Sequence, residues 1–324
     1  MAFANAPSSF SETCKDDSGQ LQVDSYSESC PEAEAIIFSW VAKAVFDDPR
    51  MAASLLRLHF HDCFGCDGSV LLDDTPEFVG EKTAAPNLNS LRGFEVIDAM
   101  KADLESACPL TVSCADVLAI AARDSVVLSN GPGWQVETGR MDGLSASKAA
   151  ANSNIPAPNS TVANLVQQFQ NVGLSLTDMV ALSGAHTLGK ARCSSFSSRL
   201  TSSDGALNSP DMNIDLMQSL QRLCSESGGD STNTLAELDL VTPATFDNQY
   251  YINLLSGEGL LASDQVLVAG DSPLVREIVE LYVQDEAAFF DDFRRSMLKM
   301  GRLGVLIGSD GEVRRNCHAI NSIN

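Results

Sequence analysis

Nine cysteines are spread along this chain of 324 residues, and they constrain its fold more than any other feature. Eight of them can close four covalent bridges, which leaves one without a partner. Their spacing does not choose among the many connectivities, so the pairing stays open at this point. Such cysteine usage indicates an oxidising compartment. The cysteines are Cys14, Cys30, Cys63, Cys66, Cys108, Cys114, Cys193, Cys224 and Cys317.

The beginning of the chain carries no matching targeting signal. Residues 1–20 contain neither a basic segment nor an apolar run long enough for a secretory signal peptide. We therefore expect a secreted protein whose targeting segment has been lost or replaced. We also expect an atypical polar tail over 1–23, followed by a single domain over 24–324. No window of 18 apolar residues occurs, so we expect no membrane span.

The charge of the chain is strongly acidic. Asp and Glu number 43 against 21 Lys and Arg, which gives a formal net charge of −22. No basic stripe offsets these acids, and we therefore expect no nucleic-acid partner. The hydrophobic content of 44% is that of a globular protein with a sizeable core.

Apolar residues recur at helical spacing along most of the chain. After Pro31, which suits the first turn of a helix, apolar side chains from Ile36 to Val45 form one stripe. Only two short stretches, 305–307 and 312–315, resemble strands. We predict a mainly α fold with a very small β component. Further helices are predicted over 50–63, 92–107, 113–128, 161–172, 177–189, 211–223, 245–255, 273–284 and 287–300.

The predicted helix 50–63 carries a basic pair on a largely apolar segment. Arg57 and His61 are four residues apart and share a helix face, with Phe60 beside them. His59 points about 160° away from His61. The ordinary interpretation of such a pair is a solvated face, but a cation on an apolar helix needs a partner or a purpose. A neutral imidazole can act as a base for peroxide, and a guanidinium can stabilise the charge that develops as the O–O bond separates.

A lone histidine, His186, lies in the predicted helix 177–189. Thr177-Asp178 is a good helix start and Gly189 a good stop. Taken alone, such a histidine is more often a hydrogen-bonded core residue than a metal ligand. Two histidine segments that face each other across a haem are, however, what peroxide chemistry on iron requires, since one imidazole binds the metal and the other handles protons.

The first segment also has residues that could bind zinc or attach haem covalently. His59, His61, Cys63 and Cys66 form an alternative zinc cluster. Covalent haem attachment at the two cysteines is not expected, because Asp67 and not histidine follows Cys66.

Together these segments resemble the plant secretory (class III) haem peroxidases, from about Gln20 to the C-terminus. The resemblance implies a haem-peroxidase fold in which a distal lobe, about 24–165, and a proximal lobe, about 166–324, sandwich non-covalent haem b. It implies an enzyme that reduces H2O2 and oxidises phenolic donors in one-electron steps through a ferryl intermediate. It further implies a monomer in the cell wall or apoplast, with the vacuole as another destination.

The resemblance assigns roles to distal residues. His61 would take a proton from H2O2 and deliver it to the leaving oxygen, Arg57 would stabilise the transition state, and Phe60 would shield the haem edge. Glu81 and Asn87 match a hydrogen-bond network in which the asparagine fixes the tautomer of the histidine.

It also assigns roles on the proximal side and at the haem edge. His186 would be the axial iron ligand, and Asp264 the carboxylate that holds its other N–H group. Read alone, Asp264 would be an ordinary loop aspartate. Pro156 matches the residue whose carbonyl contacts aromatic donors.

Two calcium sites follow from the same resemblance. The family has four residues between the cysteines that correspond to Cys63 and Cys66, whereas this chain has two. The shortening removes a main-chain carbonyl ligand and about 7 Å of chain, which puts the distal site and the placement of His61 in question. The distal ligands match Asp62, Gly65, Asp67, Ser69 and Glu81. The proximal ligands match Thr187, Asp239, Thr242, Thr245 and Asp247.

The resemblance implies four bridges, Cys30–Cys108, Cys63–Cys66, Cys114–Cys317 and Cys193–Cys224, with Cys14 unpaired. Asn159 begins the one acceptable N-glycosylation sequon. Two rival functions stay open. An intracellular ascorbate-type peroxidase would explain the missing signal peptide, and a haem-binding protein with impaired activity would result if the short loop displaced His61.

Overall fold

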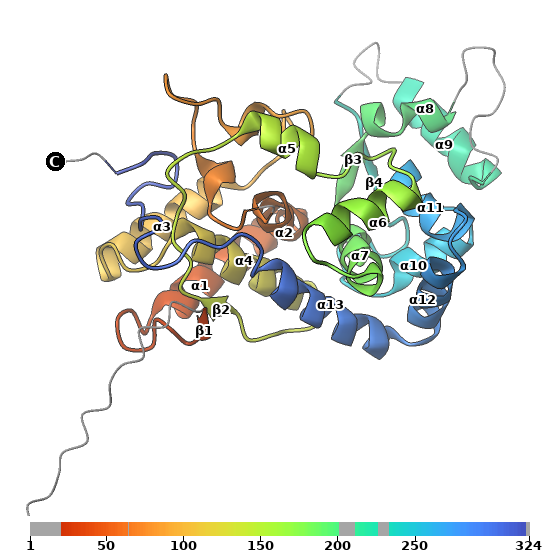
Figure 1. Ribbon diagram of the computed structural model, residues 1–324. Coiled ribbons are helices and arrows are strands. Elements are labelled where there is room, and N and C mark those ends of the chain that lie inside the picture. Colours follow the sequence, from red (N-terminus) through yellow and green to blue (C-terminus); the bar gives the residue numbers. More distant parts are fainter. Residues whose placement is uncertain (1–20, 64, 201–210, 226–232, 322–324) are drawn as a thin grey trace, which may run out of the picture.

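Helices make up most of the computed structural model, which describes residues 21–63, 65–200, 211–225 and 233–321. This confirms the predicted mainly α fold (Figure 1). The longer helices are α1 (Ala33–Asp47), α2 (Met51–Asp62), α3 (Phe94–Ala107), α4 (Cys114–Leu128), α6 (Val162–Asn171), α9 (Ile214–Ser225), α12 (Pro273–Gln284) and α13 (Glu286–Met300). The shorter ones are α5 (Lys148–Asn154), α7 (Leu176–Ser183), α8 (Ser197–Leu200), α10 (Gln249–Leu255) and α11 (Ala262–Ala269).

The β structure is smaller than the helical part, as predicted, but it lies elsewhere. Strand β1 (Gln22–Val23) pairs antiparallel with β2 (Glu137–Thr138), and β3 (Lys190–Arg192) pairs antiparallel with β4 (Leu235–Glu237). The strands predicted over 305–307 and 312–315 are wrong. Leu306 and Glu312 each form only an isolated bridge, because the chain turns between them, with Gly308 at a φ of 56°.

The predicted helix 177–189 is also corrected. Helix α7 begins at Leu176, one residue earlier than expected, because Ser175 and Asp178 form a reciprocal capping box. It ends at Ser183, and a 3₁₀ turn, η3 (Gly184–Thr187), follows it. His186 therefore lies in η3 and not in an α-helix. Asp264, expected in a loop, lies in the first turn of α11.

Two hydrophobic cores meet at α2. Leu55 and Leu58 pack into a core with α1, α3 and α4, whereas Ala52 and Leu56 pack into a core with α7 and α10 to α13. Figure 1 shows α1 to α4 on one side of the molecule and α7 to α12 on the other. Because both faces of α2 are covered, this helix is largely apolar in sequence.

Four disulfides join Cys30 to Cys108, Cys63 to Cys66, Cys114 to Cys317, and Cys193 to Cys224. These are the pairs that the resemblance implied. Cys14 lies outside the described residues. The bridge between Cys63 and Cys66 contradicts the zinc alternative, because neither sulfur remains as a thiolate ligand.

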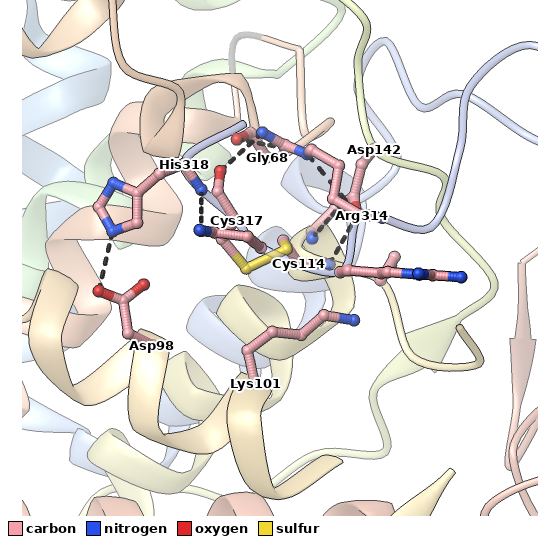
Figure 2. The surroundings of a disulfide bond; sticks show 12 residues. Gly68, Asp98, Lys101, Cys114, Asp142, Arg314, Cys317 and His318 are labelled. Carbon is pink, nitrogen blue, oxygen red and sulfur yellow. Dashed lines mark hydrogen bonds and ion pairs between the residues drawn. A yellow bond between two sulfur atoms is a disulfide. The ribbon is translucent and has the colours of Figure 1, made fainter. Parts of the chain in front are cut away.

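The C-terminal segment returns to the first half of the chain, where Arg314 fixes it (Figure 2). The guanidinium of Arg314 is fully buried and donates to the carbonyls of Cys317, at 2.8 Å, and Gly68, at 2.6 Å. The carboxylate of Asp142 accepts from the main-chain N–H groups of Arg314 and Cys114. These bonds anchor Gly68, which directly precedes the 3₁₀ turn η1 (Ser69–Leu71).

Across the ranges given above, no helix is both long and apolar enough to cross a membrane.

The buried His59 makes a testable contribution to acid stability. Its imidazole packs against the disulfide that follows α2, with 3.4 Å between Nδ1 and the Sγ of Cys63. Burial, and after it the positive charge of Arg140, lower the pKa of His59 from 6.5 to about 3. The unfolded chain therefore binds a proton in this pH window that the folded chain does not, so stability falls as the pH falls from 6.5 to 3.

Replacing His59 with glutamine removes the proton that the chain takes up on unfolding in this window. The slope of the free energy of unfolding against pH should therefore fall by about 1.4 kcal/mol per pH unit. Urea unfolding of both proteins between pH 4 and 7 measures the slopes. Equal slopes would show that another group takes up this proton.

Candidate active site

Helix α2 presents Arg57 and His61 as a hydrogen-bonded pair. The Nε of Arg57 donates to the Nε2 of His61 at 3.1 Å. The other guanidinium nitrogens donate to the carbonyls of Pro86, at 2.9 Å, and Ser90, at 3.1 Å. Burial lowers the pKa of Arg57 to about 10, with the nearby cations Arg50 and Arg192 as further causes. The guanidinium therefore stays charged at neutral pH.

The other nitrogen of the His61 ring contacts Asn87. The distance from Nδ1 to the Oδ1 of Asn87 is 2.5 Å, and the amide nitrogen of Asn87 donates to the carbonyl of Glu81 at 2.9 Å. This second bond turns Oδ1 toward the imidazole, so Nδ1 carries the proton and Nε2 is the acceptor. Burial lowers the pKa of His61 to about 3, and the charge of Arg57 is the next cause. His61 is thus a neutral base whose lone pair lies on Nε2, where it accepts from Arg57.

His186 is held by a buried carboxylate. The distance from its Nδ1 to the Oδ1 of Asp264 is 2.7 Å, and Asp264 is 3% exposed. The other oxygen of Asp264 accepts from the N–H of Leu261, and the hydroxyl of Tyr250 donates to Oδ1 at 3.1 Å. The ring of His186 is 41% exposed, and no described residue forms a hydrogen bond with its Nε2. That nitrogen is available to a ligand.

Close packing positions the turn that carries His186. A Cβ at Gly184 would lie 2.4 Å from the hydroxyl oxygen of Tyr251 and 2.6 Å from the ring of Phe289, so the turn requires glycine there. A Cβ at Gly189 would lie 2.9 Å from the Cβ of Ala53 on α2. The two histidine segments are therefore neighbours, and His186 is close enough to His61 to influence the pKa of that ring.

A cavity of about 390 Å³ lies where these segments meet. Arg50 and Ala53 line it from the start of α2, and Leu188 and Lys190 line it from the segment after His186. Arg92 is also part of the lining and forms an ion pair with Asp48. Lys190 is paired in turn with Glu237, so three cations face two carboxylates in the lining. The small positive excess suits the carboxylates of a bound ligand.

The predicted proximal calcium ligands converge on one another. The hydroxyl of Thr187 lies 3.2 Å from Oδ2 of Asp239 and 3.2 Å from Oδ1 of Asp247, and the hydroxyl of Thr242 lies 3.1 Å from the same atom of Asp247. The N–H of Thr245 donates to the carbonyl of Thr242 at 3.0 Å. Hydroxyl and carboxylate oxygens gathered in this way suit Ca²⁺.

The predicted distal ligands line a second cavity, of about 200 Å³, but most of their oxygens already accept hydrogen bonds. The carboxylate of Asp62 accepts from the N–H groups of Gly68 and Val70, and that of Asp67 accepts from the N–H of Ser69. Burial raises the pKa of Asp62 well above its usual value, and the charges of Asp67 and Glu81 add to the shift. Within the described ranges, no group of three or more His, Cys, Asp or Glu residues is disposed to hold a metal ion. The lining residues are His61, Asp62, Gly65, Asp67, Ser69, Glu81, Ser145, Ala146, Ser147, Ala150, Ala151 and Asn154.

The remaining predicted residues lie around this centre. Phe60 is half-buried against the core that contains α7. Pro156 is half-buried in the loop between α5 and α6, and no contact ties it to His61 or His186 in the described residues. The same loop reaches the proximal side, since the carbonyl of Pro158 accepts from the N–H of Ser263 at 2.9 Å.

The structure adds partners that sequence reasoning missed. Pro86 and Ser90 hold Arg57 through main-chain carbonyls, which leave no signal in a residue pattern. Tyr250 reads as an ordinary core aromatic, because nothing in the order of residues indicates that its hydroxyl meets Asp264.

Known proteins are similar to this chain over most of its length. A family model described as "Peroxidase" matches residues 37–285. Peroxidase 40 of Arabidopsis thaliana is 58% identical, over 99% of this chain and 95% of the relative. Peroxidase 9 of Arabidopsis thaliana is 51% identical, over 91% and 86%, and Peroxidase 4 of Vitis vinifera is 51% identical, over 94% and 93%.

Proposed function

The chain belongs to the plant class III peroxidases and is a peroxidase, and from that premise we propose that it uses haem b to reduce H2O2 and oxidise phenolic donors one electron at a time. The observation that carries the proposal is a neutral His61 held between Arg57 and Asn87, close to a second imidazole whose Nε2 is available.

The residues present fit haem b. His186 offers Nε2 as an axial nitrogen ligand, and Asp264 makes it more electron-donating through Nδ1. The excess of Arg50, Arg92 and Lys190 over Asp48 and Glu237 in the cavity lining suits the carboxylates of the porphyrin. When bound, haem supplies the two-electron redox chemistry that breaks the O–O bond.

His61 and Arg57 carry out the proton transfers and stabilise the charge. The Nε2 of His61 takes a proton from H2O2, and the resulting imidazolium returns it to the leaving oxygen, which departs as water. Asn87 stabilises both forms of the ring by accepting from Nδ1. The charged guanidinium of Arg57 stabilises negative charge on the departing oxygen. The hydrogen bonds of His61 to Arg57 and Asn87 also argue against the alternative function, in which the short loop displaces this ring and impairs activity.

We expect the phenolic electron donors to bind at the haem edge. Phe60 shields the edge, and the carbonyl of Pro156 receives the hydroxyl of a phenol. Steady-state turnover with a methoxyphenol and with ascorbate tests the function. We expect H2O2-dependent oxidation of the phenol at a higher kcat/KM than that of ascorbate. No turnover of either donor would contradict the proposal, and preference for ascorbate would favour the ascorbate-type alternative.

We further propose a secreted monomer in the cell wall or apoplast, or in the vacuole, that is stabilised by its four disulfides and by calcium at the proximal site. The exposed Asn159 suits a glycan. The converging oxygens of Thr187, Asp239, Thr242 and Asp247, with Thr245 beside them, support this calcium.

The calcium content of the purified protein should reflect the difference between the two sites. We expect one tightly bound calcium per chain by elemental analysis, lost in Asp247→Asn. Inserting two residues between Cys63 and Cys66 should raise the content to two, because it restores the length of the distal loop. Two calcium ions in the unaltered chain would show that the short loop still binds the metal.

A further inference from the structure

A buried tyrosine shares the carboxylate that holds His186. The hydroxyl of Tyr250, on α10, donates to Oδ1 of Asp264 at 3.1 Å, and this same oxygen pairs with the Nδ1 of His186 at 2.7 Å. The rings of Tyr250 and His186 meet edge to face, with centroids 6.3 Å apart. We propose that Tyr250 is a positioning residue that limits how strongly Asp264 polarises His186, and thereby sets the electron density that His186 gives to the iron.

The site is rigid enough for this role. Tyr250 is 2% exposed, and its ring packs edge to face against Tyr251 with centroids 5.0 Å apart. Burial and the adjacent carboxylate of Asp264 raise the pKa of Tyr250 well above its usual value, so the hydroxyl keeps its proton and remains a donor. Oδ2 of Asp264 accepts from the N–H of Leu261, at 3.2 Å.

The nearby charge of Arg199 is bonded to main-chain carbonyls. Arg199 is close enough for the charge of Asp264 to influence its pKa, but the guanidinium donates to the carbonyls of Gly259 and Leu260. Oδ1 of Asp264 thus has two side-chain donors, His186 and Tyr250. Each withdraws electron density from the oxygen, so the loss of one strengthens the bond to the other.

The consequence for iron rests on the proposed role of His186 as its ligand. A carboxylate without the tyrosine hydroxyl pulls harder on the Nδ1 proton and makes the imidazole more anionic. A more anionic ligand favours ferric over ferrous iron and stiffens the bond between iron and Nε2. Tyr250 therefore opposes the effect of Asp264.

The test compares Tyr250→Phe with Tyr282→Phe in the haem-loaded protein. Tyr282 is a matched control, because it is also a buried tyrosine that donates to a carboxylate, but its hydroxyl bonds to Asp292, at 2.8 Å, and not to Asp264. We expect Tyr250→Phe to raise the ferric-to-ferrous ratio at a fixed potential by about three- to tenfold, the effect of one hydrogen bond. The iron–histidine stretch in resonance Raman spectra of the ferrous protein should shift to higher frequency. Tyr282→Phe should change neither.

A second variant keeps the proposal testable if Tyr250→Phe does not fold. Site-specific 3-fluorotyrosine at position 250 keeps the size of the ring but is a stronger donor, so both readouts should shift in the opposite direction. Unchanged readouts, or a shift opposite to the expected one in either variant, would overturn the proposal. If the unaltered ferrous protein shows no iron–histidine stretch, the proposed function itself fails, and this inference fails with it.

Discussion

Replacing His61 with leucine is expected to lower the second-order rate constant for H2O2 by about 10²–10⁴-fold, the range that a positioned general acid–base group contributes. Leucine fills the space of the ring but takes no proton from peroxide and returns none to the leaving oxygen. Asn87 and Arg57 also lose their partner, since both hydrogen-bond the imidazole directly. Stopped-flow absorbance of the haem-loaded protein measures the rate.

The matched control for this variant is His59→Gln. His59 lies on the same helix but is buried against the Cys63–Cys66 bridge, away from Arg57. Its replacement should leave the rate with H2O2 unchanged once the protein is folded. A His61→Leu protein that reacts as fast as the unaltered one would show that proton transfer does not pass through His61.

Replacing His186 with glycine should abolish stable haem retention. Loss of a hydrogen-bond partner of a metal ligand already costs about 10–100-fold in affinity, and loss of the ligand itself should cost more. Free imidazole in the buffer should restore haem binding, because the space left by the side chain admits a ring that Asp264 can hold. The ratio of Soret to protein absorbance after gel filtration measures retention.

The milder variant Asp264→Asn separates ligation from polarisation. It keeps Nε2 of His186 available but removes the carboxylate from Nδ1. We expect partial haem retention, between that of His186→Gly and that of the unaltered protein. Full retention in His186→Gly without added imidazole would mean that another residue binds the iron.

The helices at the centre of the site could be predicted from the sequence because their signals are local. The apolar spacing around α2 predicted a helix over 50–63, which the structure has over Met51–Asp62, and it placed Arg57 and His61 on one face. The same spacing turned His59 away from His61, where it is buried against Cys63. Helical periodicity depends only on neighbours within two turns, so the sequence alone indicates it.

Long-range features left no such signal. The 3₁₀ turn that carries His186 depends on the tight approach of Gly184 to Tyr251 and Phe289, which lie far away in the sequence. The resemblance alone assigned Asp264 as the carboxylate that holds His186. Its position in the first turn of α11 and its hydrogen bond to Tyr250 became visible only in the fold. The pairing of eight cysteines was equally open until a resemblance chose one connectivity.

The loop after α2 has two residues between Cys63 and Cys66, where the resemblance implies four. The bridge closes across this loop, and His61 is hydrogen-bonded to both Arg57 and Asn87. The loop beyond the bridge is held by N–H groups that bond to Asp62 and by the buried guanidinium of Arg314. Hydrogen bonds within the protein therefore hold the distal loop in place in this chain.

In the proposed mechanism His186 would hold the haem iron, and His61, beside Arg57, would transfer the protons of peroxide. The most direct test is to mix the ferric haem-loaded protein with one equivalent of H2O2 in a stopped-flow spectrophotometer. We expect a rapid loss of Soret absorbance, reversed when a phenolic donor is added. A Soret band that peroxide leaves unchanged, in protein shown to contain haem, would contradict it.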